Sequence, residues 1–359
     1  MMHTSMEYTI STGHFWIMRH GNVPAHAIGL LFLMLLSWVP MSAQGDWDLG
    51  FTSGMSNYMG DIGDGLSSRR DFIWDMQELR TRPAFGVFAR RKLDRDGLWW
   101  VRADFMSINI AGHDKHTDYE ARRGRNLHFR NQITETSFRI ERDLFQQPLV
   151  WARQRRAMVT VRAFVGFAYF EHNPETQVDA NNPAYANLIE RGITSPGEWH
   201  SLPELQTEGI NYADQLRMTT IPFGLSAVIT GQKKGGANDF YVGLELGIRL
   251  TDTDYLDDIS GFYADPSEMS ALGAALSSQA NEVVMEEAGI SHSVVNHQWH
   301  SDEHMVIRGN PANNDAYGTL VVSFGKVLNG RSNSFNRNRS RYGNKRKGGL
   351  FKKRTRMRF

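Results

Sequence analysis

The chain has 359 residues, with 40 Lys and Arg against 39 Asp and Glu, and no cysteine. The lack of cysteine excludes disulfides, thiolate metal sites, cysteine nucleophiles and a lipid anchor on an N-terminal cysteine. No window reaches the roughly 18 apolar residues that a membrane-spanning helix needs. A membrane β-barrel passes this test, because only alternate residues of its strands face lipid.

The first recognisable segment is an apolar run from Ile28 to Leu36, followed by Pro40 and the small pair Ser42-Ala43. This order predicts a secretory signal peptide over residues 1–43, cleaved after Ala43. A buried core helix is the alternative. Because the stretch before the apolar run is long, we hypothesise that Met18 is the true start.

The clearest strand runs from Phe240 to Thr251, where apolar residues alternate with polar, small or aromatic ones. Glu245 and Arg249 on its polar face would point into a barrel lumen and pair there. Seven further runs have a similar pattern: 46–56, 82–92, 98–110, 127–143, 157–171, 216–230 and 316–328. Five aromatic residues fall toward strand ends, where interface girdles are expected: Trp99, Trp100, Tyr169, Phe170 and Tyr317.

The connections between these eight runs alternate in length. The longest, 172–215 and 252–315, follow odd-numbered strands, whereas short ones such as 93–97 and 231–238 follow even-numbered strands. Outer-membrane barrels have short periplasmic turns and long extracellular loops, and an even strand number leaves both termini in the periplasm. We therefore predict an all-β, eight-stranded antiparallel transmembrane β-barrel over residues 44–330 in the outer membrane. A soluble β-sandwich is the alternative.

The charges divide the chain into an acidic body and a basic tail. Residues 44–330 carry 38 acidic and 27 basic residues. The tail, 331–359, has no acid and twelve basic residues, which are candidates for binding a periplasmic partner: Arg331, Arg337, Arg339, Arg341, Lys345, Arg346, Lys347, Lys352, Lys353, Arg354, Arg356 and Arg358. Its Asn-, Arg-, Ser- and Gly-rich composition predicts disorder. Basic runs also suit nucleic acid, but an exported chain rarely meets any, so acidic protein surfaces or anionic envelope polymers are the expected partners.

Two groups of residues are weighed as metal sites. Asp252, Asp254, Asp257 and Asp258 offer the carboxylate oxygens that calcium prefers, although they lack the twelve-residue calcium-loop pattern. The alternative is a strand end with solvated carboxylates and local turn caps. A zinc site is weaker still, since its four histidines lie in one long loop without the His-Glu-x-x-His spacing: His292, His297, His300 and His304.

Motifs of catalysis are absent from the sequence. There is no Gly-x-Ser-x-Gly elbow, phosphate loop or dinucleotide fingerprint. We therefore expect no enzyme, no catalytic residues and no cofactor, with an outer-membrane protease or acyltransferase as the alternative.

Several segments together resemble the PorG-type outer-membrane barrels of the Bacteroidota type IX secretion system. They are spread over residues 47–328: Arg82-Pro-Ala-Phe-Gly86, Asn126-Leu-His-Phe-Arg-Asn131 with Glu135, Thr207-Glu-Gly209, Ile221-Pro-Phe-Gly224, Thr253-Asp-Tyr-Leu-Asp-Asp-Ile-Ser260, Arg308-Gly-Asn-Pro311 and Asn314-Asp-Ala-Tyr317.

The resemblance implies a non-enzymatic component of a protein secretion system. Its barrel would sit in the outer membrane and hold a ring of periplasmic partners, including a lipoprotein-type ring subunit. Such systems export proteins and in some species support gliding. A paralogue with another envelope role would match the same segments. A small channel or transporter remains the functional alternative, but eight strands enclose too little space for an aqueous pore.

Overall fold

The computed structural model describes residues 47–62, 80–93, 98–117, 120–152, 155–232, 238–280, 286 and 308–328. The predicted signal peptide, the basic tail and the four loop histidines lie outside the described residues.

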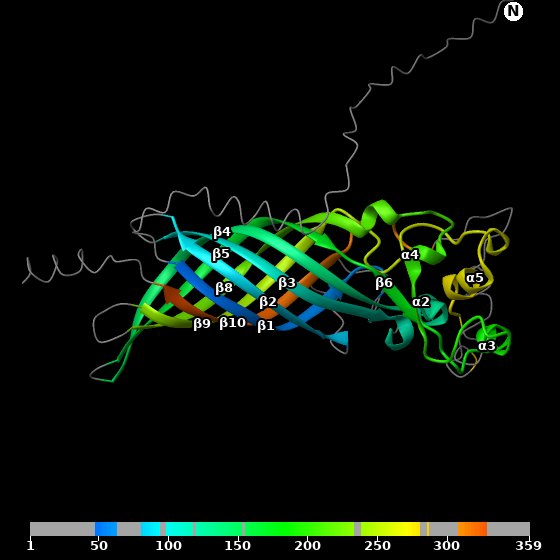
Figure 1. The fold of residues 1–359 in the computed structure, drawn as a ribbon, viewed down its shortest axis with the longest axis horizontal. Helices are drawn as coiled ribbons and strands as arrows, with labels where there is room; N and C mark the ends of the chain where they lie inside the picture. The colour runs from blue at the N-terminus through cyan, green and yellow to red at the C-terminus, as the bar shows by residue number, and fades with distance from the viewer. Residues whose placement is uncertain are drawn as a thin grey trace, which may run out of the picture. The chain divides into compact units, whose positions relative to one another are not determined.

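Eight antiparallel strands form a closed barrel (Figure 1). Each pairs with its neighbours along the chain, and pairing of the first with the last closes the sheet. The strands are β1 (Trp47–Met59), β2 (Arg82–Lys92), β3 (Trp99–His113), β4 (His128–Ala152), β5 (Arg155–Glu171), β8 (Arg217–Gln232), β9 (Asn238–Thr251) and β10 (Ala316–Leu328). The predicted eight-stranded antiparallel barrel is confirmed.

The bounds of β2 and β10 match the sequence prediction, whereas β4 is longer than predicted. β4 continues to Ala152, so the expected connection after Asp143 is mostly strand. The register between β4 and β5 shifts between Asp143 and Phe145, and Leu144 and Phe145 are both exposed. A bulge of this kind interrupts the alternation of faces, which is why periodicity alone ended the strand too early.

Apolar side chains cover the outer face of the barrel. Met55 of β1 lies opposite Leu320 of β10, Leu320 opposite Leu246 of β9, and Leu246 opposite Leu225 of β8. All four are exposed, and no described segment of the chain covers them. A row of uncovered leucine and methionine across four strands is typical of a lipid-facing belt.

The predicted aromatic girdle is only partly correct. Trp99 is exposed and Tyr169 half-buried on the outer face, but Trp100, Phe170 and Tyr317 are buried inside the barrel. Adjacent residues of a strand point to opposite faces, so Trp100 and Phe170 could not accompany Trp99 and Tyr169 outward.

Inside the barrel, aromatic rings lie across glycines of the neighbouring strand. Gly325 of β10 is opposite Tyr241 of β9, and a Cβ at Gly325 would lie 2.2 Å from a ring carbon of Tyr241. Gly50 and Phe88 make the same arrangement between β1 and β2, with 2.5 Å to the ring. Only glycine allows the rings this close, and the rings then fill space inside the barrel.

The remaining elements gather beyond one end of the barrel (Figure 1). They are η3 (Asp114–His116), α2 (Glu120–Arg125), β6 (Pro174–Gln177), η4 (Pro183–Tyr185), α3 (Ala186–Glu190), β7 (Trp199–Ser201), α4 (Leu202–Leu205), η5 (Ala213–Leu216), η6 (Pro266–Glu268) and α5 (Ala271–Ser277). β6 pairs with the start of β4, and β7 pairs with β6. The described parts of the two longest predicted connections, 172–215 and 252–315, therefore contain short helices, and the first also contains two short strands. In the described part of the chain, no helix is long and apolar enough to span a membrane.

We predict that Leu246→Arg destabilises the barrel by about 2–4 kcal/mol, because a charge would face the lipid midplane. Ile210→Arg is the matched control. Ile210 is as exposed as Leu246 (55% against 53%) but lies in the connection beyond the barrel end, so its substitution should cost less than about 0.5 kcal/mol. Urea unfolding in lipid vesicles measures both. Equal effects at the two positions would contradict a lipid-facing Leu246.

Candidate functional site

Charged side chains fill the interior of the barrel. Five arginines and six carboxylates of the strands are buried there: Arg90, Arg102, Arg139, Arg162, Arg249, Asp48, Asp104, Glu135, Glu141, Asp143 and Glu245. Burying a charge costs several kcal/mol unless it is paired and hydrogen-bonded. The arginines and carboxylates offset this cost for one another.

Glu245 lies at the centre of this network. Its carboxylate accepts hydrogen bonds from Arg139 at 2.6 Å and from Arg102 at 3.3 Å. Arg249 also lies in the lumen, as expected, but donates to Glu135 at 3.1 Å. Both side chains lie in the lumen as expected, but they form their ion pairs with residues of other strands and not with each other. Glu245 and Arg249 are four positions apart in β9, and a strand extends about 13 Å over four residues. This distance separates their two ion pairs.

Aromatic rings complete the filling of the lumen. The guanidinium of Arg102 lies 3.9 Å from the ring centre of Phe88, and that of Arg139 lies 4.2 Å from the ring centre of Phe164. Such contacts stabilise a desolvated cation. Together with the ion pairs they leave the described part of the lumen packed with side chains.

We predict that Glu245→Gln destabilises the barrel by about 3–5 kcal/mol, because Arg139 and Arg102 lose the charge that compensates their burial. The control is Glu171→Gln, which removes the half-exposed pair between Glu171 and Arg217 and should cost less than about 1 kcal/mol. Urea unfolding of both variants in detergent, followed by tryptophan fluorescence, measures the difference. Equal stability of the two variants would refute the dependence on buried charge pairing.

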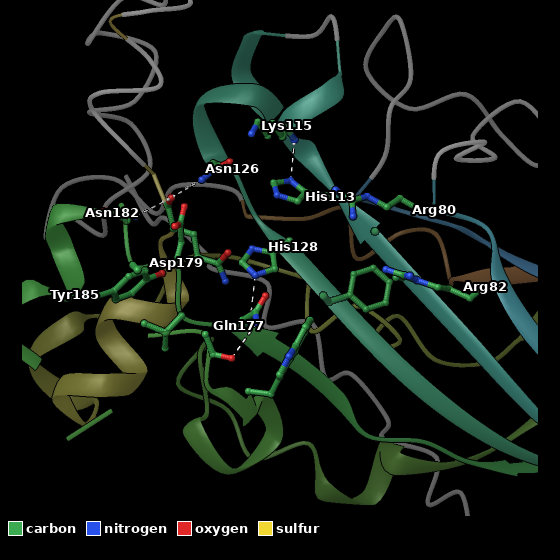
Figure 2. A pocket seen from close by; sticks show the side chains of 18 residues that line it. Arg80, Arg82, His113, Lys115, Asn126, His128, Gln177, Asp179, Asn182 and Tyr185 are labelled. Atoms are coloured by element: carbon green, nitrogen blue, oxygen red, sulfur yellow. Dashed lines mark hydrogen bonds between the residues drawn. The ribbon is translucent and has the colours of Figure 1, made fainter. Parts of the chain in front are cut away.

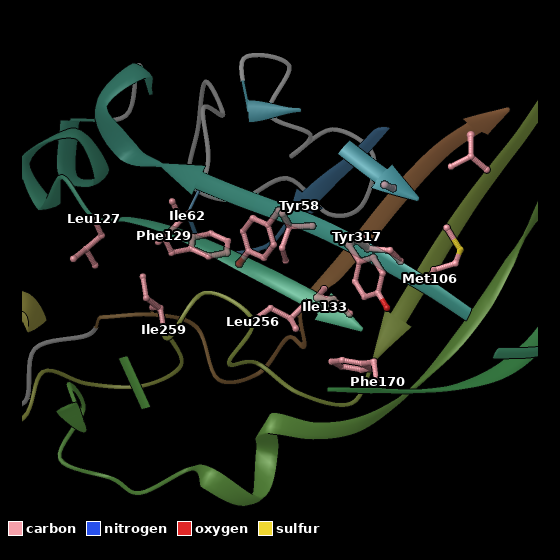
Figure 3. Close-up of a cluster of buried hydrophobic side chains, with 14 residues drawn as sticks. Tyr58, Ile62, Met106, Leu127, Phe129, Ile133, Phe170, Leu256, Ile259 and Tyr317 are labelled. Carbon is pink, nitrogen blue, oxygen red and sulfur yellow. The ribbon is translucent and has the colours of Figure 1, made fainter. Parts of the chain in front are cut away.

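An apolar cluster closes the end of the barrel on which the helices lie (Figure 3). Leu256 and Ile259 come from the connection between β9 and β10 and pack among side chains of the strands. The cluster contains Tyr58, Ile62, Ala84, Met106, Ile108, Ile110, Leu127, Phe129, Ile133, Phe170, Leu256, Ile259, Tyr317 and Val321. We call the segments 202–216, 252–280 and 308–315 the cap.

Arg308 joins the segments of the cap to one another. Its guanidinium donates to Glu208 at 3.1 Å and to Asp258 at 3.0 Å. Asp258 also accepts from the hydroxyls of Thr207 and Tyr212, and Glu208 accepts from the backbone N–H of residue 260 at 2.9 Å. Burial raises the pKa of both carboxyls, while Arg308 acts in the opposite direction.

Tyr58 joins the cap to the barrel. Its hydroxyl oxygen lies 2.6 Å from Asp257 and 2.7 Å from Asp315. A hydroxyl has one proton, so it cannot donate to two ionised carboxylates at once. One of these short contacts therefore requires a protonated carboxyl. In agreement, burial raises the pKa of both carboxyls. Burial, followed by the charge of Asp61, raises the pKa of Asp257 to about 7, and burial, followed by the charge of Asp257, raises the pKa of Asp315 well above its ordinary value.

The four aspartates weighed as calcium ligands contact different partners. Asp252 is exposed and accepts from Thr219, whereas Asp257 and Asp258 are buried in the contacts just described, and Asp254 is buried as well. Within the described ranges, no group of three or more His, Asp or Glu is arranged to hold a metal ion. The alternative of solvated carboxylates is wrong for three of the four: Asp254, Asp257 and Asp258 are buried, and the last two serve as hydrogen-bond acceptors within the cap.

We predict that the cap opens more readily as the pH rises from about 4 to 7. The raised pKa of Asp257 means that the closed cap holds a proton that the open cap releases near pH 4. This contribution to closure is complete at low pH and is lost as the pH passes about 7. Hydrogen exchange of residues 252–280 at several pH values measures it. Asp257→Asn should weaken the dependence, leaving the part that the buried Asp315 contributes, and the exposed control Asp252→Asn should keep it in full. An unchanged profile in Asp257→Asn would contradict the prediction.

The cap brings together three segments that carry the resemblance to PorG-type barrels and lie far apart in the sequence. Thr207-Glu208, Thr253–Ser260 and Arg308-Gly309 supply its buried hydrogen bonds. Sequence reasoning missed this assembly because its partners are about 50 or more residues apart. The twelve candidate basic residues of the tail lie outside the described residues.

Comparisons with known proteins add the following. Residues 26–193 match a family described as a domain of unknown function, DUF6089. No curated protein matches the chain. Ail, the attachment invasion locus protein of Yersinia pestis, solved in complex with the heparin analogue sucrose octasulfate, is 8% identical, with 79% of this chain and 99% of Ail covered and a TM-score of 0.30. CarO2 of Acinetobacter baumannii is 8% identical, with 77% and 99% covered and a TM-score of 0.19. The TodX deltaS2S3 mutant monoaromatic hydrocarbon channel is 10% identical, with 63% and 64% covered and a TM-score of 0.19. At these TM-scores, the barrel assignment rests on the strand pairing of this chain itself.

Proposed function

We propose that this protein is a non-enzymatic outer-membrane component of a protein secretion system of type IX. In this role the barrel anchors periplasmic ring proteins, including a lipoprotein-type subunit, to the outer membrane. The apolar outer face of the barrel supports the membrane location. The resemblance of the quoted sequence segments to PorG-type barrels supports the secretion role.

The observation that carries the proposal is the filled interior. The network around Glu245 occupies the lumen, and the apolar cluster with Leu256 and Ile259 closes one end. A channel needs a continuous polar path, and eight strands enclose too little space for one beside these side chains. A barrel without such a path acts through its surfaces, which favours an anchor over a transporter.

The lengths of the connections support an orientation of the barrel in the membrane. Residues 153–154 alone join β4 to β5, and 233–237 join β8 to β9, whereas the opposite end holds the cap. Outer-membrane barrels place short turns in the periplasm. In the proposed orientation the cap faces the exterior, and the basic tail enters the periplasm after β10.

The tail supplies the charge for recruiting acidic partners. Twelve positive charges and no acid follow Gly330. Long-range attraction of this kind speeds encounter and weakens as salt shortens the screening length below about 10 Å. Specific contact would then come from the short periplasmic turns.

We predict that deleting residues 331–359 leaves a folded, membrane-inserted barrel but lowers both recovery of periplasmic ring partners and secretion. The loss of recovery should be greatest at low salt, because raised salt already screens the attraction of the tail in the intact protein. Pull-down from solubilised outer membranes at two salt concentrations measures recovery, and the unheated gel mobility of the barrel controls for folding.

A second variant separates charge from length in this experiment. Replacing the twelve basic residues by Gln should reproduce the deletion, since the proposed role depends on charge. Unchanged partner recovery and secretion in both variants would reject the role of the tail. A steady ion current of the intact protein in planar bilayers would instead favour the channel alternative.

A further inference from the structure

A hollow of about 450 Å³ lies beside the cap, outside the contacts that close the barrel (Figure 2). The ends of β3 and β6, the starts of β2 and β4, and β7 form its walls. This volume is within the range of small-ligand sites. Nothing in the proposed anchoring role uses it.

The charge of this hollow is opposite to that of the body. Arg80, Arg82 and Lys115 line it, against a single carboxylate, Asp179. Residues 44–330 as a whole carry an excess of acid. Cations gathered in a concave surface of an acidic protein favour an anionic ligand, because the walls focus their field on the space between them.

The uncharged lining is held in fixed orientations. His113 and His128 stack with ring centres 5.1 Å apart, and each ring accepts a backbone N–H, from residue 115 at 2.9 Å and residue 177 at 3.2 Å. Asn126, in the left-handed conformation at φ 55°, donates to the backbone carbonyl of Gln279 at 3.1 Å. A site whose polar groups are already ordered loses little conformational entropy on binding.

A second hollow, of about 970 Å³, adjoins the first, since Arg82 and Trp199 line both. The guanidinium of Arg130 lies 3.7 Å from the ring centre of Trp199 and is held there by Glu175 at 2.7 Å. Glu171 and Glu175 balance the cations of this hollow, so it is close to neutral and rich in hydrogen-bonding groups. An aromatic ring beside amides and ion pairs suits the apolar faces and hydroxyls of a sugar.

The position of the hollows relative to the apolar outer face of the barrel indicates where such a ligand would come from. The second hollow includes outward residues of β3 and β4, namely Asn109, Gln132 and Thr134. Along the strands the outer face next becomes apolar, with exposed Phe85 and Phe105. If the proposed outer-membrane location holds, on which this inference rests, the hollows lie at the level of lipid headgroups on the outer surface.

We propose that the two joined hollows bind the acidic sugar headgroup of a glycolipid of the outer leaflet. The anionic group lies in the first hollow among Arg80, Arg82 and Lys115, and the adjoining sugar rings lie along Trp199 in the second, toward the membrane. The protein thereby holds a glycolipid beside the secretion assembly.

Titration of the purified full chain in detergent with lipopolysaccharide, and separately with the acidic oligosaccharide released from it, tests the proposal. Both should bind, lipopolysaccharide more tightly because it also retains its acyl chains. The double variant Arg82→Gln, Lys115→Gln removes two exposed cations and should weaken binding of the oligosaccharide at least about tenfold. Trp199→Ala should weaken it by a similar factor.

Matched controls are Arg191→Gln and Phe262→Ala, exposed residues of the same end of the molecule that line neither hollow. Both should bind like the unsubstituted protein. If neither probe binds, the proposal is wrong. Equal affinity of the hollow variants and the controls for the oligosaccharide would also overturn it. Binding of oligosaccharide without competition from lipopolysaccharide in vesicles would reject the lipid-linked source.

The same variants separate this inference from the anchoring role. Recovery of periplasmic partners should be unaffected by the hollow variants, since the hollows lie at the end of the barrel opposite to Leu328, after which the tail follows in the sequence. Deletion of 331–359 should leave oligosaccharide binding intact. A negative result for oligosaccharide binding therefore does not affect the test of partner recovery, and a negative result for partner recovery does not affect the test of oligosaccharide binding.

Discussion

Pairing of buried charges inside the barrel is the constraint on which the rest of this structure depends. An eight-stranded barrel leaves room for side chains only, so each inward arginine needs a carboxylate on a facing strand. Arg139 of β4 and Arg102 of β3 meet Glu245 of β9 across the lumen. A slip of one residue in any of these strands would turn its charges toward the lipid. The network therefore fixes the register of the barrel as well as filling it.

This constraint also explains how much of the fold could be predicted from the sequence. An inward charged face and an outward apolar face produce strict alternation, as in β9, and the number, order and approximate bounds of the strands follow from it. The prediction fails where the alternation of apolar and polar residues is interrupted or does not determine which face a residue occupies. The shift after Asp143 hides the second half of β4. The position of Trp100 near a strand end predicts a girdle residue, but its neighbour Trp99 occupies the outer face.

The candidate site could not be predicted in this way, because its contacts join residues that are far apart in the chain. Tyr58 and Asp315 are 257 positions apart, and Asp258 and Arg308 are 50 apart. Local composition gathered four aspartates into one possible calcium site. The backbone at Asp258, with φ 72°, instead helps to send successive carboxylates to different partners, Asp257 to Tyr58 and Asp258 to Arg308. Local patterns report which face a residue occupies, but not which distant residue it meets.

The buried contacts also bear on how such a barrel can act. Opening the capped end would expose Leu256 and Ile259 and separate Arg308 from both Glu208 and Asp258. Breaking a buried ion pair costs several kcal/mol, and here the pairs share one arginine, so they would be lost together. Clearing the lumen would in addition require unpairing Glu245. A transport cycle would have to meet these costs at each turn, whereas an anchor keeps the barrel closed and uses its two ends for binding.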